Sequence, residues 1–436
     1  MILNTLEEPI EIDAFDYLYV FLCVIFLGSA TVFTQGSLEN FGLSVNGGVE
    51  SVIGKLLMFL LSVCLLTKYG FHPSQCFNRK ITLIIIVWGI LQYFVYRKFS
   101  TYPFVRLMNV YFAMVLIICY GEKLVYILDH IFVKLAIISV VLWSFLVLVP
   151  DVVEFFLSMS PIKGYGLVKG NSIFVFASGF QYEIVKRNIG FAWEPGRFGS
   201  IMAFAVFLNL IVNKMEVRNN KGFWILSVAI LSSQSTTAYL AYLAVLVFFL
   251  YNRDRKYIVK LIPFVLLFAV LLLSLDFMGE KLQDLSVFNE EHQEDFERQL
   301  EYYSTQDNVL VPQRFDGLLL EGLNILHSPL IGNATDTYSY LEEMFGLKFS
   351  LSNGVLRIFA NMGLFIGVLY YWLLIKSSKW MSNTYQYKGT MAFFLIFFMI
   401  NISYSWIFEP IFLTFILYPF IVKELYNSDG YVEEKA

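Results

Sequence analysis

Residues 189–213 read IGFAWEPGRFGSIMAFAVFLNLIVN, a short charged turn followed by a long apolar run. Glu194, Pro195, Gly196 and Arg197 stand immediately before that run. An acidic residue and a proline suit the first turn of a helix, and an arginine can extend its charged end to a membrane interface. The stretch therefore predicts the start of a membrane-embedded helix, and it leaves open whether Glu194 and Arg197 also take part in chemistry.

The composition of the whole chain points to the same class of protein. Of the 436 residues, 58% are hydrophobic and only 15% are charged, and the mean hydropathy is +0.64. Soluble globular domains have roughly a quarter of their residues charged. Solid apolar runs indicate transmembrane helices, because membrane barrels show weak alternating segments instead. We expect an all-α, polytopic integral membrane protein that forms a single membrane domain over residues 1–436.

Twelve apolar runs are candidates for transmembrane helices. They cover about residues 17–34, 49–67, 81–96, 104–120, 131–149, 198–213, 222–235, 237–251, 258–277, 353–375, 389–408 and 410–424. The seventh and eighth are the least distinct, because polar residues 232–237 interrupt one long apolar region. The first run follows an acidic stretch and lacks the basic segment of a cleaved signal peptide, so we expect it to remain as a helix.

The positions of lysine and arginine set the predicted orientation. Basic clusters fall in four connections on one side of the twelve-span arrangement: Lys68, Arg79 and Lys80; Lys214, Arg218 and Lys221; Arg253, Arg255 and Lys256; and Lys376, Lys379 and Lys388. By the positive-inside rule that side is the cytoplasm, which places both termini there. Arg97 and Lys98 are an exception, because they fall on the outer side beside the third run.

Two long connections are then extracytoplasmic, at residues 150–197 and 278–352. The second can cross the membrane without violating the charge rule, because its fourteen acidic residues outnumber its four basic ones, Lys281, Arg298, Arg314 and Lys348. We therefore expect chemistry at the outer face.

The second long connection also holds an expected helix. Phe315, Leu319, Leu323 and Leu326 recur at helical spacing, which predicts an amphipathic helix over residues 313–327 at the membrane surface.

No sequence motif suggests a metal, a cofactor or a nucleic acid. The four cysteines, Cys23, Cys64, Cys76 and Cys119, are scattered outside the two long connections, which argues against a disulfide framework or a metal site. The chain has no Walker A loop, no Rossmann fingerprint and no stretch of alternating strands and helices. We expect chemistry without a cofactor and a chain that binds no nucleic acid.

Five arginines are predicted on the outer side: Arg106, Arg187, Arg197, Arg314 and Arg357. Charged groups within a membrane are costly and are usually retained for function. Contact with lipid headgroups is the alternative explanation for each arginine. If the five converge, they form an anion site, because guanidinium groups match phosphate oxygens in a bidentate way.

Several segments of the chain resemble the O-antigen polymerase and O-antigen ligase superfamily, the Wzy-type membrane glycosyltransferases of bacterial envelopes. The segments are RNIGFAWEPGRFGSIMAFA (187–205), SSQSTTAYLAYLAVL (232–246), RFDGLLLEGLNILHSPLIGNA (314–334) and SLSNGVLRIFANMGLFIG (350–367). The resemblance rests on the order and spacing of these segments and on their common predicted location at the outer face of the membrane. It spans about residues 180–375. Ser352 stands where the ligases have a histidine, which favours a polymerase. Ala334 stands where a second glycine is usual, which weakens the case for close backbone approach there.

The resemblance implies a GT-C-like, metal-independent, inverting glycosyltransferase of the bacterial cytoplasmic (inner) membrane. The donor would be a growing glycan on a polyprenyl pyrophosphate, and the acceptor a new lipid-linked repeat unit. Membrane lipids, a flippase and chain-length regulator proteins would be its partners. The product would be O-antigen, capsule or exopolysaccharide.

The same resemblance assigns roles to residues. It implies that Arg197 and Arg314 bind the pyrophosphate and stabilise the leaving group. Arg106, Arg187 and Arg357 would add further contacts to the same anion.

The acceptor side of the reaction leaves more than one assignment open. Glu194 would either accept the acceptor proton or orient an arginine, and the second role is favoured because a carboxylate beside arginines is a poor base. His327 is the alternative base, although its place as a polar residue at a helix C-terminus is the favoured explanation. Asn353 is a candidate acceptor contact.

Three other functions stay open. A ligase would move the finished glycan to another acceptor, and Ser352 argues against it. A flippase or transporter for lipid-linked oligosaccharide would also use many helices and an arginine-rich cavity, but it needs no long outer connections. A purely structural membrane scaffold is the third.

Overall fold

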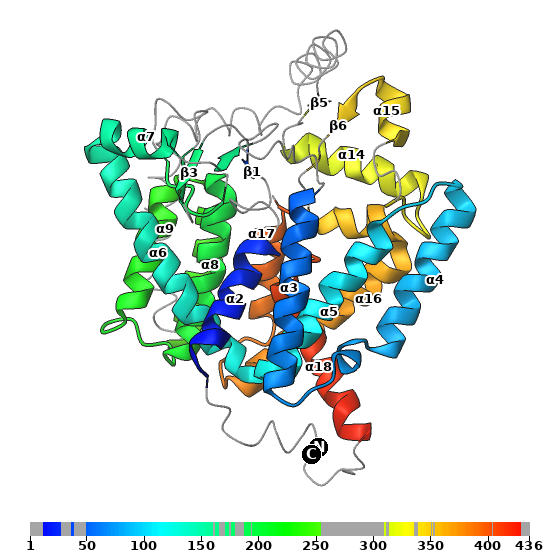
Figure 1. Ribbon diagram of the computed structural model, residues 1–436, viewed down its shortest axis with the longest axis horizontal. Helices are drawn as coiled ribbons and strands as arrows, with labels where there is room; N and C mark the ends of the chain where they lie inside the picture. Colours follow the sequence, from blue (N-terminus) through cyan, green and yellow to red (C-terminus); the bar gives the residue numbers. More distant parts are fainter. Residues whose placement is uncertain are drawn as a thin grey trace.

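The computed structural model is a bundle of helices with smaller elements at one end (Figure 1). It describes residues 12–27, 36–38, 49–159, 162–164, 171–173, 176–178, 187–192, 194–253, 309–310, 314–334, 339–349, 351, 354–402 and 404–428. The predicted run at 258–277 lies outside these residues. Each of the other predicted runs coincides with a helix over all or part of its length.

The described structure is mainly α-helical. Its α-helices are α2 (Ala14–Phe26), α3 (Val49–Lys68), α4 (Arg79–Tyr96), α5 (Tyr102–Tyr120), α6 (Leu124–Leu148), α7 (Pro150–Ser158), α8 (Pro195–Val212), α9 (Lys221–Ser233), α10 (Thr236–Arg253), α14 (Arg314–His327), α15 (Ser339–Phe345), α16 (Gly354–Thr384), α17 (Ala392–Asn401) and α18 (Pro410–Ser428). Two 3-10 helices, η2 (Pro73–Cys76) and η3 (Gly121–Lys123), lie in the α3–α4 and α5–α6 connections.

Several of these helices are suited to a membrane. Among the described residues, the helices long and apolar enough to cross one are α4, α8, α16 and the 47-residue stretch Tyr102–Leu148, which holds α5 and α6. Helices α2, α9 and α17 and the part of α18 up to Val422 are shorter apolar helices. The chain is therefore described as a helical membrane protein, whereas the count of twelve spans and the GT-C-like arrangement remain predictions.

Helix α8, which follows the charged turn, is among the most buried helices of the bundle. Every residue from Phe198 to Ile211 is buried, and α8 packs against α6, α9, α10 and α17. The helix begins at Pro195 and not at residue 198, because the extended Glu194 leads directly into a proline at the first helical position. A Cβ atom at Gly199 would overlap the Ala238 side chain, so glycine permits α8 to approach α10 closely.

Short strands occur in the connections, in addition to the helices expected from the sequence. Strands β1 (Gly36–Leu38), β2 (Ile162–Gly164), β3 (Asn171–Ile173) and β4 (Phe176–Ser178) form an antiparallel sheet in that order. Strands β5 (Val309–Leu310) and β6 (Lys348–Phe349) pair in parallel. The first sheet joins the connection after α2 to the connection after α7. In Figure 1, β1, β3, α7, α14 and α15 lie at the same end of the helices, so parts of both long connections share one face.

Helix α14 occupies the predicted amphipathic segment, but a different face is buried. Leu319 and Leu326, which were expected on the apolar face, are 55% and 78% exposed. The buried face holds Leu320, Glu321 and Asn324, and it packs on α15 and α16. No described residue covers these two leucines, so they are available to lipid, as a helix on a membrane surface requires.

Two helices break inside runs that were predicted as continuous. Helix α16 has a non-helical residue, Gly363, with φ 80° and ψ 173°. Helix α17 ends at Asn401 although the predicted run reaches 408, and α18 begins only at Pro410. The Asn401 Oδ1 atom accepts a hydrogen bond of 2.9 Å from the Trp406 N–H, which stabilises the non-helical backbone there. The break in α16 comes six residues after Arg357. The break after α17 holds Tyr404, whose ring faces Arg197.

Candidate functional site

The predicted pair Glu194 and Arg197 forms an ion pair in the first turn of α8. The Arg197 Nε atom lies 3.4 Å from Glu194 Oε2, and the two side chains are 18% and 37% exposed. Glu194 is the extended residue that precedes Pro195, so its carboxylate can reach the side chain one turn further on. This geometry suits a carboxylate that orients an arginine.

Arg197 also faces an aromatic ring from a distant part of the chain. Its guanidinium carbon lies 5.1 Å from the centre of the Tyr404 ring. Gly196 makes this arrangement possible, because a Cβ atom there would overlap the Tyr404 hydroxyl. Arg197 therefore contacts both Glu194 and Tyr404.

Tyr404 belongs to the α17–α18 turn, defined here as residues 402 and 404–409. The turn is fixed by several helices: Asn109 of α5 donates to the Phe408 carbonyl at 2.9 Å, and Tyr370 of α16 donates to the Ile407 carbonyl at 2.9 Å. Gly354, at the start of α16, lies so close that a Cβ atom would overlap the Tyr404 carbonyl.

The α17–α18 turn supplies an aromatic ring to Arg197 and another to Arg106, and sequence reasoning missed it. The available signals were the polar residues of the run NISYS (401–405) and the Glu409-Pro410 pair within an otherwise apolar region. Glu409 is 9% exposed and places a carboxylate in the same turn.

Arg106 of α5 stacks between two aromatic rings. Its guanidinium carbon lies 4.0 Å from the Tyr102 ring centre and 4.1 Å from the Phe408 ring centre. The Arg106 Nε atom is buried and has no hydrogen-bond partner among the described residues. Rings that cover both faces of a guanidinium leave its edge, where the N–H donors are, as the direction for recognising an anion.

The structure brings Arg106 and Arg357 together. The two cations lie within electrostatic range of each other, and Lys55 of α3 lies within the same range of Arg106. Arg357 Nη1 also donates a hydrogen bond of 3.0 Å to the Leu351 carbonyl. Arg106 is therefore repelled by both Arg357 and Lys55, and an anion bound beside Arg106 would be stabilised.

Glu321 of α14 is the main residue that sequence reasoning missed. Its side chain has no exposed surface, and Arg357 lies within electrostatic range. Within the part of the chain that the structure describes, neither carboxylate oxygen accepts a hydrogen bond of regular geometry, although the Asn324 amide is a polar neighbour. Burial raises the pKa of Glu321 to about 7, even though Arg357 and Asn324 act in the opposite direction.

The loop after α14 inserts into the break of α16. The Asn333 N–H donates to the Ala360 carbonyl at 2.8 Å, and the Leu364 N–H donates to the Pro329 carbonyl at 2.7 Å. Gly332 and Gly363 both have positive φ, 70° and 80°. A Cβ atom on either would overlap backbone atoms of the other segment. The close backbone approach is thus made at Gly332, next to the position where Ala334 replaces a glycine.

Helix α4 holds this loop through side chains on one face. Trp88 Nε1 donates to the Ile331 carbonyl at 2.9 Å. Gln92 Nε2 lies within 3.0 to 3.1 Å of the carbonyls of Ile331, Gly332 and Asn361. Tyr96 adds a hydrogen bond of 3.0 Å to the Gly332 carbonyl. The four-residue spacing of Trp88, Gln92 and Tyr96 places them on the same side of the helix.

Arg187 lies in a segment that is anchored near the start of α8. Asn188 is fully buried, accepts a hydrogen bond of 2.6 Å from Ser139 and donates one of 2.9 Å to the Ser232 hydroxyl. Arg187 itself lies within electrostatic range of Tyr239 on α10.

The structure does not place the three remaining predicted site residues, His327, Arg314 and Asn353, beside these arginines. His327 is exposed and stacks on Tyr340 of α15, with ring centres 4.0 Å apart and planes 11° apart. Arg314 is the first residue of α14, but its side chain lies outside the described residues. Asn353 also lies outside them.

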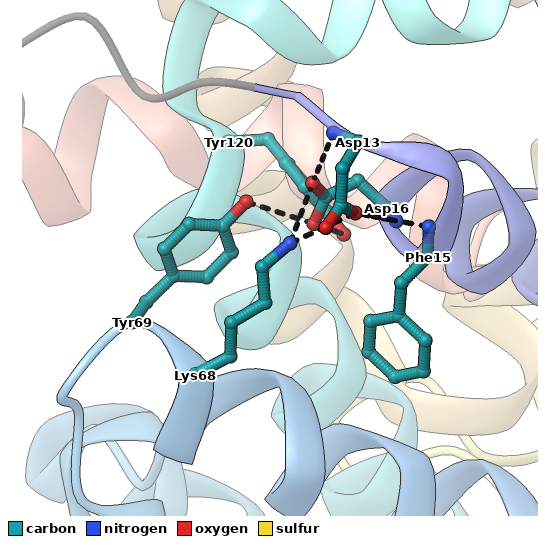
Figure 2. A network of polar contacts seen from close by, with 6 residues as sticks. All are labelled: Asp13, Phe15, Asp16, Lys68, Tyr69 and Tyr120. Atoms are coloured by element: carbon teal, nitrogen blue, oxygen red, sulfur yellow. Dashed lines mark hydrogen bonds and ion pairs between the residues drawn. The ribbon is translucent and has the colours of Figure 1, made fainter.

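A second polar cluster, which sequence reasoning did not predict, lies at the start of α2 and the end of α3. Figure 2 shows the fully buried Asp16 carboxylate surrounded by Lys68, Tyr69 and Tyr120, at 2.9, 2.8 and 3.2 Å. Lys68 also bridges to Asp13 at 2.9 Å, and that contact lowers the pKa of Asp13 to about 2. The cluster ties α2, α3 and α5 together.

Comparison with known proteins gives no relative: no protein-family model, no curated protein and no solved structure matches the chain. Among the described residues, no group of three or more histidine, cysteine, aspartate or glutamate side chains is placed to hold a metal ion. Function is therefore argued from the site geometry and from the motifs of the sequence.

Proposed function

We propose that the chain is an oligosaccharide repeat-unit polymerase, which joins polyprenyl-pyrophosphate-linked glycan units at the outer face of the bacterial cytoplasmic membrane. The observation that supports this most is that two cations near the starts of α5 and α16, Arg106 and Arg357, lie within electrostatic range of each other. Two guanidinium groups match the doubly charged pyrophosphate of such a donor.

Arg197 completes the proposed anion site from α8. Arg197 and Arg106 both stack on rings of the α17–α18 turn, Tyr404 and Phe408, which are four residues apart. Arg314 and Arg187 are assigned to the same anion from the motifs of the sequence. The resemblance to O-antigen polymerases supports this set.

The proposed reaction is an inverting transfer without a metal. A hydroxyl oxygen of the acceptor forms a bond to the anomeric carbon of the donor, and the bond from that carbon to the pyrophosphate oxygen breaks. The pyrophosphate leaves with the electron pair, and the hydroxyl proton passes to a base or to water. The arginines stabilise the negative charge that grows on the leaving group.

The proposal is tested with single arginine variants in a strain that lacks the native gene. We expect Arg197→Ala, Arg314→Ala and Arg106→Ala each to lower polymer formation on the order of 10² to 10³-fold, while the protein stays in the membrane. A gel of surface polysaccharide and mass spectrometry of the lipid-linked intermediates provide the measurement. Arg218→Ala is the matched control, because Arg218 is an exposed arginine beyond the opposite end of α8.

The pattern of products separates the candidate functions. Loss of a polymerase leaves single repeat units at the surface, whereas loss of a flippase leaves almost no surface glycan. Loss of a ligase leaves long chains on the lipid carrier. Chains of wild-type length from both Arg197→Ala and Arg314→Ala would contradict the pyrophosphate assignment.

A further inference from the structure

The buried carboxylate of Glu321 has no use in the mechanism described above. It is completely buried, and neither oxygen has a regular hydrogen bond to any of the residues that the structure describes. An ionised carboxylate in such a place is unfavourable unless a cation compensates it. Burial accordingly raises the pKa of Glu321 to about 7, so the group can gain or lose a proton near neutral pH.

The charge that acts on Glu321 comes from α16. Arg357 is the cation within electrostatic range, and Arg357 in turn lies within range of Arg106. On α15, which also packs on α14, the titratable side chains are Tyr340, Glu342 and Glu343, and on α14 itself His327 is exposed. The side chains of Arg314 and Lys348 lie outside the described residues.

We propose that Glu321 is a proton-linked counter-ion of the anion site: as a carboxylate it compensates Arg357 while the site is empty, and it takes up a proton when a pyrophosphate diester binds. This inference rests on the proposed function, because it takes Arg106 and Arg357 as contacts of the pyrophosphate. Glu321 is thus a positioning residue that acts through Arg357.

The direction of the coupling follows from charge. A bound anion places negative charge near Glu321 and competes for Arg357, so the protonated carboxyl becomes more favourable in the complex. Glu321 therefore has a higher pKa in the complex than in the free protein. As the pH falls through the range between these two pKa values, the affinity for the anion rises. It is constant below about pH 7, where Glu321 of the free protein is already protonated. Each unit of difference between the two pKa values changes the affinity about tenfold.

The test uses the full chain in lipid nanodiscs and a dialkyl pyrophosphate diester. The charge of this probe does not change between pH 6 and 9. We expect the wild type to bind the probe about tenfold more weakly at pH 8.5 than at pH 6.5, and to take up protons at pH 8, measured by calorimetry in buffers of different ionisation enthalpy. Glu321→Gln should bind equally at both pH values, with the affinity of the wild type at pH 6.5.

Two further variants complete the design. Glu343→Gln is the matched control, because Glu343 is an exposed carboxylate on the adjacent α15, and it should keep the wild-type pH dependence. Arg357→Gln should lose most of both the affinity and the pH dependence.

The outcomes separate the two proposals. A wild type that binds the probe without proton uptake, or a Glu321→Gln protein that keeps the full pH dependence, overturns the counter-ion role and leaves the polymerase proposal standing. A wild type that does not bind the probe at either pH contradicts the pyrophosphate site itself, and the counter-ion role falls with it. The proton uptake of the wild type decides the matter even where Glu321→Gln does not fold.

Discussion

Glu194 is the residue whose two candidate roles can be separated by one substitution. Its ion pair with Arg197, at 3.4 Å, places it where it can orient the arginine. We expect Glu194→Gln to reduce polymer formation about tenfold without changing the pH profile, because the ion pair that orients Arg197 is lost while no proton acceptor of the reaction is removed. The measurement is the rate of polymer formation between pH 6 and 9 with lipid-linked repeat units. A loss of 10³-fold or more at all pH values would instead identify Glu194 as the base.

Asp16 is a residue whose charge matters for stability. It is fully buried and contacts Lys68, Tyr69 and Tyr120 (Figure 2). Asp16→Asn weakens three contacts to a buried charged group, and a hydrogen bond to a charged group contributes about 1.5–3 kcal/mol to the free energy of unfolding, so this variant should lower the unfolding midpoint in detergent clearly. Asp13→Asn, at a carboxylate that is 55% exposed, should have a smaller effect. Equal midpoints for the wild type and Asp16→Asn would contradict the structural role of this cluster.

At the scale of elements, the contact between the loop after α14 and the break of α16 depends on glycine. Gly363 has a backbone conformation that only glycine adopts readily, and a side chain there would overlap the Leu330 carbonyl. We expect Gly363→Ala to cost roughly 2–5 kcal/mol and to reduce activity, because the loop that leads from α14 is displaced. Thermal unfolding and polymer formation are the two measurements.

Gly322→Ala is the control for that prediction. Gly322 lies within α14, and a Cβ atom there would meet no atom within 4 Å. Alanine favours the helix by up to about 1 kcal/mol relative to glycine, so this variant should be at least as stable as the wild type. If both alanine variants behave alike, the contact at Gly363 does not control the position of the loop.

The sequence indicated some elements well and others poorly, for physical reasons. Helix α8 was predictable because a proline precedes a run of apolar residues, and the pattern is local. The buried position of Glu321 was not, because the periodicity of α14 shows two possible faces and only packing on α15 and α16 chooses between them. The kink at Gly363 depends on a loop some thirty residues earlier, and the pairing of β1 with β2 joins residues 36–38 to 162–164, so neither is visible in a local pattern.

At the scale of the whole molecule, the structure predicts which surfaces share a side of the membrane. Helices α7 and α15 lie at one end of the bundle (Figure 1), and the α8–α9 connection follows the opposite end of α8. In a Cys64→Ser background, we expect Glu154→Cys and Glu343→Cys to react with an impermeant maleimide in intact cells, and Arg218→Cys to react only after permeabilisation. All three positions are exposed. Labelling of Arg218→Cys and Glu343→Cys from the same side would contradict this arrangement.

The hydrogen bonds from α4 to the loop after α14 also affect the order in which the helices assemble during synthesis. Gln92 finds its carbonyl partners 239 to 269 residues further along the chain, and the α4 window that could span a membrane is only 17% buried. At 5–20 residues per second, α4 waits on the order of 10–50 seconds before those partners leave the ribosome. During that time its amide and indole N–H groups face lipid or a membrane chaperone, so the docking of α4 is a late step of biogenesis.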